Sequence, residues 1–271
     1  MLAAIVLTAA LSPFEQVVVA ERAFAAASLA RGQHPAFLEY LTEDAIAFEP
    51  VPTPARPLHE GKPNAGATLT WGPSWVAVAS AGDLAISTGP WELRRTEEPR
   101  LKMTGWFFSI WRREPGGAWK VAVDSGISTS LTFAIPSTVT DGAPSRGATA
   151  PGPAEAARAR GGIMTAERKL GAAAAKGLGA AVLAQADHGI RVYRADKAPS
   201  SSLDDAKPLL ASDLRRVSCV ADRVVGAAGG DLGYAYGTCA DASPGANKLG
   251  FLRVWRKDAA GAWKVLADVT P

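Results

Sequence analysis

The nine-residue stretch GGAWKVAVD at positions 116–124 decides the fold, because it returns almost unchanged as AGAWKVLAD at 260–268. The match extends upstream, so that FFSIWRREPGGAWKVAVD (107–124) corresponds to FLRVWRKDAAGAWKVLAD (251–268). In both copies two tryptophans, eight residues apart, bracket a short turn that contains glycine. Alternating residues on both sides of such a turn predict a β-hairpin whose tryptophans lie roughly opposite each other. One hairpin is therefore expected twice.

A second hairpin is predicted upstream of each copy. Residues 75–91 match residues 218–239 around a shared Gly-Asp-Leu, found at 82–84 and 230–232. Glycine followed by aspartate between apolar runs is typical of a tight turn. Because helices are also predicted before both segments, the whole domain, and not only its last hairpin, is expected to occur twice.

The helix that opens the first copy carries its own start and stop signals. Ser12 and Glu15 form a capping box with Pro13 at the first helical position, and Arg31 followed by Gly32 ends the helix. The further elements expected are a helix at 35–41 and a strand at 45–50 in the first copy, and a helix capped by Thr165, a helix at 179–186 and a strand at 189–194 in the second.

Between the copies lies a segment that lacks large apolar residues. Residues 136–162 are rich in Pro, Gly, Ala, Ser and Thr, which cannot build a hydrophobic core, so they are predicted to form a linker. The predicted organisation is a signal segment at 1–11, a first domain at 12–135, the linker at 136–162 and a second, degenerate domain at 163–271. A chain of 271 residues suits two domains of about 100–130 residues each.

The charge balance argues against a polyanionic partner. The formal net charge is only +3, from 29 basic and 26 acidic residues, and the basic residues are scattered. So small an excess exerts little pull on nucleic acid, and no nucleic-acid binding is expected.

The first residues form an apolar run from Leu2 to Leu11. Its length matches the hydrophobic region of a signal peptide and is too short to cross a bilayer, although no basic residue precedes it. Two alternatives remain: an export signal, which would make the protein periplasmic or secreted, or a buried N-terminal segment in a cytoplasmic protein. No membrane span is expected elsewhere.

Several short words of the first copy resemble a known superfamily. WGPSW (71–75), SAGDL (80–84) and STGPW (87–91), followed by the tryptophan-bounded hairpin, resemble the nuclear transport factor 2-like superfamily. Ketosteroid isomerases and polyketide cyclases belong to that superfamily, and these words look closest to its uncharacterised secreted branch. The resemblance covers residues 12–128 well and 163–271 moderately.

The resemblance implies an α+β fold: two tandem cone-shaped domains, each a curved antiparallel β-sheet packed around N-terminal helices, with an apolar pocket between sheet and helices. Relatives of this kind often dimerise through the outer face of the sheet. The two copies are accordingly expected to form an intramolecular pseudo-dimer, with a homodimer as the alternative. The fold itself hosts many activities and does not fix one.

Glu49 is the candidate catalytic residue that the resemblance suggests. In the isomerases this strand carries a general-base aspartate just before a proline, and Glu49 precedes Pro50 here. A carboxylate at an apolar pocket could move a proton next to a carbonyl. The isomerases also need oxyanion donors, and the matching positions, near Phe24 and Phe107, carry side chains that cannot donate. The alternative is that Glu49 is a solvated residue at a strand end.

Aromatic residues of the first copy are candidates for lining a ligand pocket, with an ordinary core role as the alternative. These candidate ligand-binding residues are Phe24, Trp71, Trp75, Trp91 and Trp106. Trp111 and Trp119 recur in the second copy, so packing is the simpler role for them.

Cys219 and Cys239 lie equally far on either side of Gly229, at the expected hairpin turn. That spacing puts them opposite each other on adjacent strands, where they form either a disulfide or two buried thiols. No metal-binding motif and no cofactor motif is present. The three histidines are isolated in sequence and are expected to be surface or hydrogen-bonded residues.

Three functions remain open. The first is binding of a small apolar or aromatic molecule in the first domain, and the second is a proton-transfer enzyme of isomerase or lyase type that uses Glu49. The third is a protein-interaction module. The missing oxyanion donors rank binding above catalysis.

Overall fold

The computed structural model describes residues 11–64, 66–95, 97, 102–142, 147, 150–241 and 248–270. The predicted signal segment therefore lies outside the described residues, apart from Leu11.

The first domain begins with two helices, α1 (Pro13–Arg31) and α2 (Gln33–Tyr40). Ser12 accepts a hydrogen bond from the backbone N–H of Glu15, and the Glu15 carboxylate accepts one from the backbone N–H of Ser12, so the predicted capping box is confirmed. The remaining elements are β1 (Leu41–Phe48), β2 (Pro52–Pro54), η1 (Arg56–Leu58), β3 (Ala67–Trp71), β4 (Trp75–Val78), β5 (Leu84–Arg95), β6 (Lys102–Arg113), β7 (Trp119–Thr129) and β8 (Thr140–Asp141).

The second domain repeats the general order of two helices, one strand and then a run of antiparallel strands. It contains α3 (Pro153–Ala174), α4 (Leu178–Ala184), β9 (Ala186–Arg194), α5 (Leu203–Ser212), β10 (Val217–Gly226), β11 (Leu232–Asp241), β12 (Lys248–Lys257) and β13 (Trp263–Thr270). In the described chain the sheet order is β2-β1-β7-β6-β5-β4-β8 in the first domain, with β3 also paired to β5, and β10-β11-β12-β13-β9 in the second. Both sheets are antiparallel except where the first strand of each domain, β1 or β9, joins the last long strand, β7 or β13, and except for the short β4–β8 pair. The expected α+β class with two helix-backed sheets is confirmed.

The segment predicted as a linker is partly folded. Within residues 136–162, β8 pairs with β4 in the first sheet, and α3 already begins at Pro153. The stretch from Pro153 is rich in alanine, with proline at the first turn, and both features favour a helix. Ala159 of this stretch and Ile163, just after it, are both buried, so the start of α3 belongs to the folded second domain and not to a linker. Thr165 lies inside α3 and does not cap it, because its hydroxyl donates to the Gly161 carbonyl.

The terminal hairpins have a register slightly different from the expected one. Trp111 pairs with Val121, and Trp119 pairs with Arg113, so the two tryptophans are diagonal neighbours and not opposite each other. A register shift between Ile110 and Trp111 displaces the strand by one residue, as a β-bulge does.

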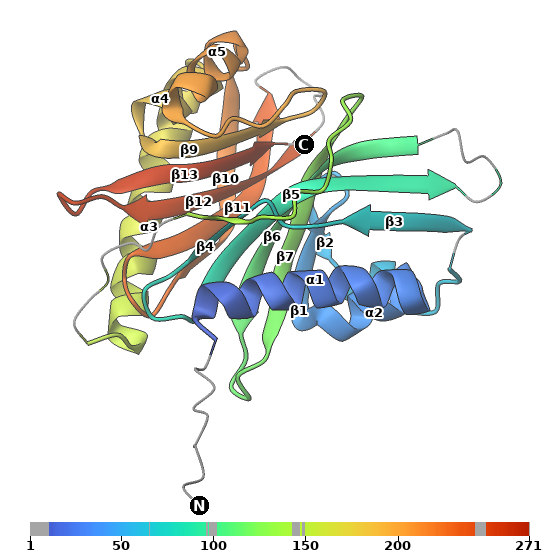
Figure 1. Ribbon diagram of the computed structural model, residues 1–271. Helices are drawn as coiled ribbons and strands as arrows, with labels where there is room; N and C mark the ends of the chain where they lie inside the picture. The colour runs from blue at the N-terminus through green and yellow to red at the C-terminus, as the bar shows by residue number, and fades with distance from the viewer. Residues whose placement is uncertain are drawn as a thin grey trace, which may run out of the picture.

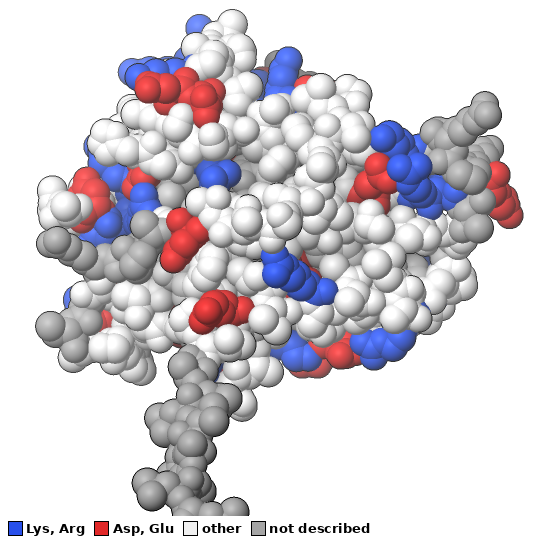
Figure 2. All heavy atoms as spheres, viewed as in Figure 1, with Lys and Arg blue, Asp and Glu red and all other residues white. Residues whose placement is uncertain are grey.

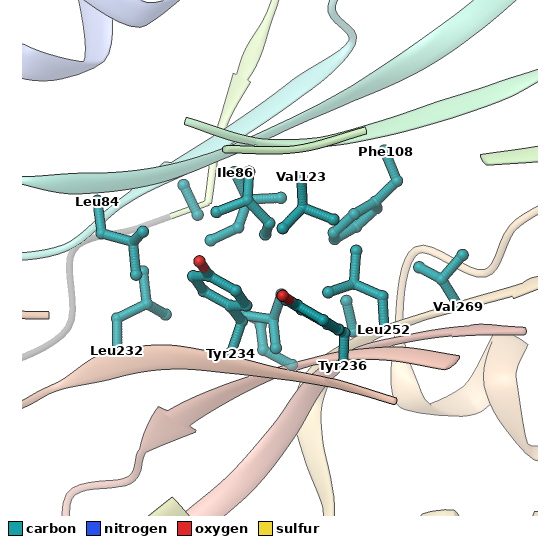
Figure 3. Close-up of a cluster of buried hydrophobic side chains, with 14 of the residues drawn as sticks. Leu84, Ile86, Phe108, Val123, Leu232, Tyr234, Tyr236, Leu252 and Val269 are labelled. Atoms are coloured by element: carbon teal, nitrogen blue, oxygen red, sulfur yellow. The ribbon is translucent and has the colours of Figure 1, made fainter. Parts of the chain in front are cut away.

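The two domains stack sheet against sheet, with their helices on the outside (Figure 1). The layer between the sheets is apolar: Figure 3 shows Leu84, Ile86, Phe108 and Val123 from the first domain facing side chains of the second. The second domain contributes Leu232, Tyr234, Tyr236, Leu252 and Val269. The Tyr193 hydroxyl crosses the same layer and donates to the Thr88 hydroxyl at 3.0 Å. The chain therefore forms its own pseudo-dimer.

The two Gly-Asp-Leu turns exchange hydrogen bonds across this pseudo-dimer. The Asp83 carboxylate accepts from the backbone N–H of Ala228 at 2.8 Å, and the Asp231 carboxylate accepts from the backbone N–H of Ser80 at 3.0 Å. Equivalent positions of the two copies thus contact each other reciprocally, which is the pattern of a two-fold symmetric interface. The sequence suggested only a local turn role for these aspartates.

Charged side chains of both signs are mixed on the visible surface (Figure 2). On the face shown in Figure 2, lysine and arginine side chains lie interspersed with aspartate and glutamate. Among the described residues, none of the helices is sufficiently long and apolar to span a bilayer.

The reciprocal turn contacts predict matched losses of stability. Asp231→Ala and Asp83→Ala each remove a charged acceptor and leave a backbone N–H of the other domain unpaired, which should lower the free energy of unfolding by about 1–3 kcal/mol. Urea unfolding followed by tryptophan fluorescence measures the loss. Asp204→Ala, on an exposed side chain of α5, is the control and should change stability little. Equal stability of all three variants would contradict the assigned role.

A second prediction concerns the cysteines. Cys219 and Cys239 occupy opposite positions of β10 and β11 and are joined by a disulfide bond with a sequence separation of 20. A closed loop of that size restricts the unfolded chain and should contribute about 3 kcal/mol to stability. The double variant Cys219→Ser/Cys239→Ser should therefore unfold at lower urea concentration, and a reducing agent should shift the unreplaced protein equally. A shift with the reductant that persists in the double variant would point to another cause.

Candidate functional site

A cavity of about 900 Å³ lies in the first domain. Its walls come from α1 and α2 on one side and from the sheet strands β1, β3, β5, β6 and β7 on the other. A single residue of the second domain, Ala195, also lines it. The cavity is large enough for a drug-sized molecule.

One wall of the cavity is aromatic. Phe24 of α1 lies at its centre, with ring centroids 4.8 Å from Phe37, 4.9 Å from Tyr40 and 4.9 Å from Trp71. Trp91 of β5 lines the same space. Edge-to-face and stacked rings of this kind hold one another in place and offer flat apolar surfaces to a ligand.

A buried carboxyl, Glu21, lies on the helix side of the cavity. It belongs to the apolar stripe of α1 and is 0% exposed, yet it is not isolated. The indole N–H groups of Trp71 and Trp111 donate to its two oxygens at 2.7 and 2.9 Å. Burial raises the pKa of Glu21, and the two tryptophan hydrogen bonds oppose that rise.

A second carboxyl, Asp124 of β7, is half-buried and meets the cavity. The Ser109 hydroxyl is 3.4 Å from its Oδ1, which makes a weak hydrogen bond. Burial, together with the nearby charge of Glu21, raises the pKa of Asp124 to about 7. A carboxyl that titrates near neutral pH can both hold and release a proton there.

Two histidines meet at the cavity although they are 25 residues apart in sequence. The Nδ1 atoms of His34 and His59 are 3.0 Å apart, and both residues line the cavity. The His59 ring also stacks on Phe37 at 4.5 Å. Burial, followed by the neighbouring His34, lowers the pKa of His59 to about 4. The His59 ring is therefore neutral at pH 7.

The predicted ligand-binding residues separate into two groups. Phe24, Trp71 and Trp91 line the cavity. Trp75 and Trp106 do not line it: Trp75 is buried in the layer between the domains, and Trp106 packs against the same layer. Alternation along a strand explains Trp106, because its neighbour Phe107 points into the cavity and successive side chains point to opposite faces.

Glu49 also lines the cavity, and its side chain is exposed. The less exposed carboxyls of the cavity are instead Glu21 and Asp124, which were not selected from the sequence. A usable signal was present for Glu21, since it interrupts the apolar helical stripe of Val17, Phe24 and Ser28 at regular spacing.

Within the described parts of the chain no group of three or more His, Cys, Asp or Glu side chains is arranged to hold a metal ion.

The comparisons with known proteins concern the fold. No known family model matches the chain, and no curated protein matches it. Among solved structures, the chain is similar to a conserved protein from Planctomyces limnophilus DSM 3776, at 15% identity and a TM-score of 0.34, over 43% of this chain and 96% of that one. It is also similar to a nuclear transport factor 2-like protein with a cystatin-like fold from Novosphingobium aromaticivorans, at 17% identity and a TM-score of 0.35, over 44% of this chain and 82% of that one. A third is a nuclear transport factor 2-like superfamily protein from Salmonella enterica, at 12% identity and a TM-score of 0.36, over 45% and 94% of the two chains.

The architecture described above, two tandem α+β domains, agrees with the fold that the resemblance to the nuclear transport factor 2-like superfamily led us to expect. Each consists of N-terminal helices packed on a curved sheet whose first strand joins its last long strand in parallel. These likenesses concern the fold alone, so the cavity has to be interpreted from its own residues.

The titration of Asp124 predicts a pH-dependent stability. Because its pKa in the folded protein is about 7 against an ordinary value of 3.8, the unfolded chain loses this proton first as the pH rises. The stabilisation is fully present below about pH 4 and is lost as the pH approaches about 7. Asp124→Asn should remove this decline and be the more stable protein at about pH 8.

Urea unfolding at a series of pH values, compared between the natural chain and the variant, measures the difference. Asp204→Asn, on the exposed face of α5, is the control and should follow the natural chain. Parallel pH profiles for the natural chain and Asp124→Asn would show that Asp124 does not titrate in this range.

Proposed function

We propose that the protein binds a small apolar or aromatic molecule in the cavity of its first domain. The observation that carries the proposal is the cavity of about 900 Å³ with its wall of packed aromatic rings. Small-molecule sites are typically concave, mostly apolar and supplied with a few polar groups that fix the orientation of the ligand. Glu21, Ser109 and Asp124 are such polar groups.

The second domain supports this assignment by contrast. Arg253 of β12 is 0% exposed and fills the space between the second sheet and α3, where its guanidinium contacts Glu167 and Asp268. A side chain therefore occupies the position that is open in the first domain. On this proposal the second domain is a structural partner that covers the first sheet.

A second candidate function is proton-transfer catalysis of isomerase or dehydratase type. It is favoured by Asp124, whose pKa of about 7 suits a general acid or base at neutral pH. Glu49, which also lines the cavity, would then be an additional proton carrier at its exposed side. If an activity exists, Asp124→Asn should abolish it, and Glu49→Gln tests the alternative residue.

A role as a protein-interaction module has less support. A partner of such a domain would bind an open face of a sheet. Here each sheet has one face covered by the helices of its own domain and the other face covered by the sheet of the other domain. Export is a further part of the proposal, supported by the Cys219–Cys239 disulfide, since disulfides persist in oxidising compartments such as the periplasm.

Native mass spectrometry of the full chain, purified from its own source, tests binding. We expect a non-covalent adduct of small-molecule mass that is released by collisional activation. Ala47→Phe, which places a large ring inside the cavity, should lose the adduct because the ligand and the ring compete for the same volume. Ala180→Phe, on a residue near the α4–α5 surface, is the matched control and should retain it.

An adduct that survives Ala47→Phe would place the ligand elsewhere, and a bare protein would weaken the binding proposal. The same intact mass shows whether the N-terminal apolar segment has been removed.

A further inference from the structure

The two domains contain the same site with different residues, so one can be compared with the other. In the first sheet Ser109 lies opposite Asp124, and in the second sheet Arg253 lies opposite Asp268. These pairs are equivalent positions of the repeated hairpin. The same site therefore contains serine and aspartate in one copy, and arginine and aspartate in the other.

The arginine of the second domain is held by two buried carboxylates. Its Nε donates to Asp268 at 2.7 Å, and its Nη1 donates to Glu167 at 2.9 Å. The guanidinium carbon also lies 4.2 Å from the centre of the Phe251 ring, which is a cation–π distance. The buried charges of this domain are thus compensated inside the protein, as buried charges must be.

The first domain has the matching carboxylates and aromatic ring, but among the described residues no cationic side chain lies between them. Glu21 accepts the indole N–H of Trp111, just as Glu167 accepts the indole N–H of Trp255 at 2.7 Å. Phe107, at the repeat position of Phe251, lines the cavity together with Glu21 and Asp124. The arginine is replaced by Ser109, whose short side chain leaves the space open. The second oxygen of Glu21 accepts the indole N–H of Trp71 at 2.7 Å, where that of Glu167 accepts from Arg253.

A second cation is also exchanged between the copies. Arg194 of β9 donates to Asp268 at 2.6 Å, and its counterpart after β1 in the first domain is Glu49. Arg194 and Arg253 of the second domain are therefore replaced in the first domain by Glu49 and Ser109, respectively. Among the described lining residues there is no Lys or Arg, and the titratable groups facing the cavity are Glu21, His34, Glu49, His59 and Asp124.

An acidic, low-dielectric cavity with aromatic walls attracts positive charge. We propose that the ligand of the first domain carries a cationic nitrogen group of the amidinium, guanidinium or ammonium type, which lies between Glu21 and Asp124 as the Arg253 guanidinium lies between Glu167 and Asp268. This inference rests on the proposed binding function and specifies the chemistry of its ligand. The apolar part of the ligand contacts Phe24, Trp71 and Trp91.

A rival arrangement is a pair of protonated carboxyls that donate hydrogen bonds to a carbonyl group of the ligand. The two arrangements respond to pH in opposite ways. A cation binds the ionised form of Asp124, whose pKa is about 7, so its affinity rises with pH. A carbonyl acceptor needs the protonated form, so its affinity falls with pH.

The test uses the full chain with benzamidine and its neutral isostere benzamide, measured by calorimetry between about pH 6 and about pH 8. Benzamidine stays cationic over this range. We expect benzamidine to bind at least roughly tenfold more tightly than benzamide at the higher pH, and to weaken several-fold at the lower pH.

Two substitutions separate charge from shape. Asp124→Asn keeps the shape of the site and removes its charge, so it should abolish the preference for benzamidine while benzamide binding is retained. Ser109→Arg recreates the residue of the second domain and should exclude benzamidine by occupying its site. Asp204→Asn, on an exposed side chain, should leave both probes unaffected.

The outcomes distinguish the two proposals. Equal binding of both probes, or tighter binding of benzamide at low pH, would overturn the cationic ligand and leave small-molecule binding intact. Binding of neither probe at millimolar concentration, together with a bare protein in native mass spectrometry, would overturn both.

Discussion

A carboxylate buried on the first helix of each domain is the constraint on which the rest of the structure depends. Glu21 and Glu167 lie in apolar stripes that face a sheet, and an unpartnered carboxylate there would be costly. Each is satisfied by an indole N–H from the repeated hairpin, Trp111 or Trp255. This hydrogen bond fixes the helix over the sheet, and it explains why Trp111, in the strand before the hairpin turn, recurs as Trp255.

The same carboxylates determine how the two copies differ. A buried glutamate beside a buried aspartate calls for positive charge, and in the second domain Arg253 supplies it from within the chain. In the first domain Ser109 leaves the pair without an internal cation, and burial, together with repulsion from Glu21, raises the pKa of Asp124. The exchange of Arg253 for Ser109, together with that of Arg194 for Glu49, thus distinguishes the closed core of the second domain from the cavity of the first.

The sequence predicted what local patterns encode. The capping box at Ser12, the hairpin turns and the opposition of Cys219 and Cys239 depend on residues close in the chain or on simple counting along strands. The helix from Pro153 was missed because its small residues look like a linker until a sheet packs against them. The meeting of His34 with His59, and of Glu21 with Asp124, depends on how α1 and α2 dock on the sheet, which no local pattern specifies.

A site of this kind weakens the domain that contains it, and the tandem arrangement shows how the cost is tolerated. The first domain retains a large cavity and an uncompensated acidic pair, both of which reduce stability. Its outer sheet face is covered by the second domain, whose own acidic pair is neutralised by Arg253 and whose turn is tied back through Asp83 and Asp231. The domain whose site is filled by Arg253 thus packs on the domain that contains the cavity, and burial of the apolar layer between them offsets part of the cost of that cavity.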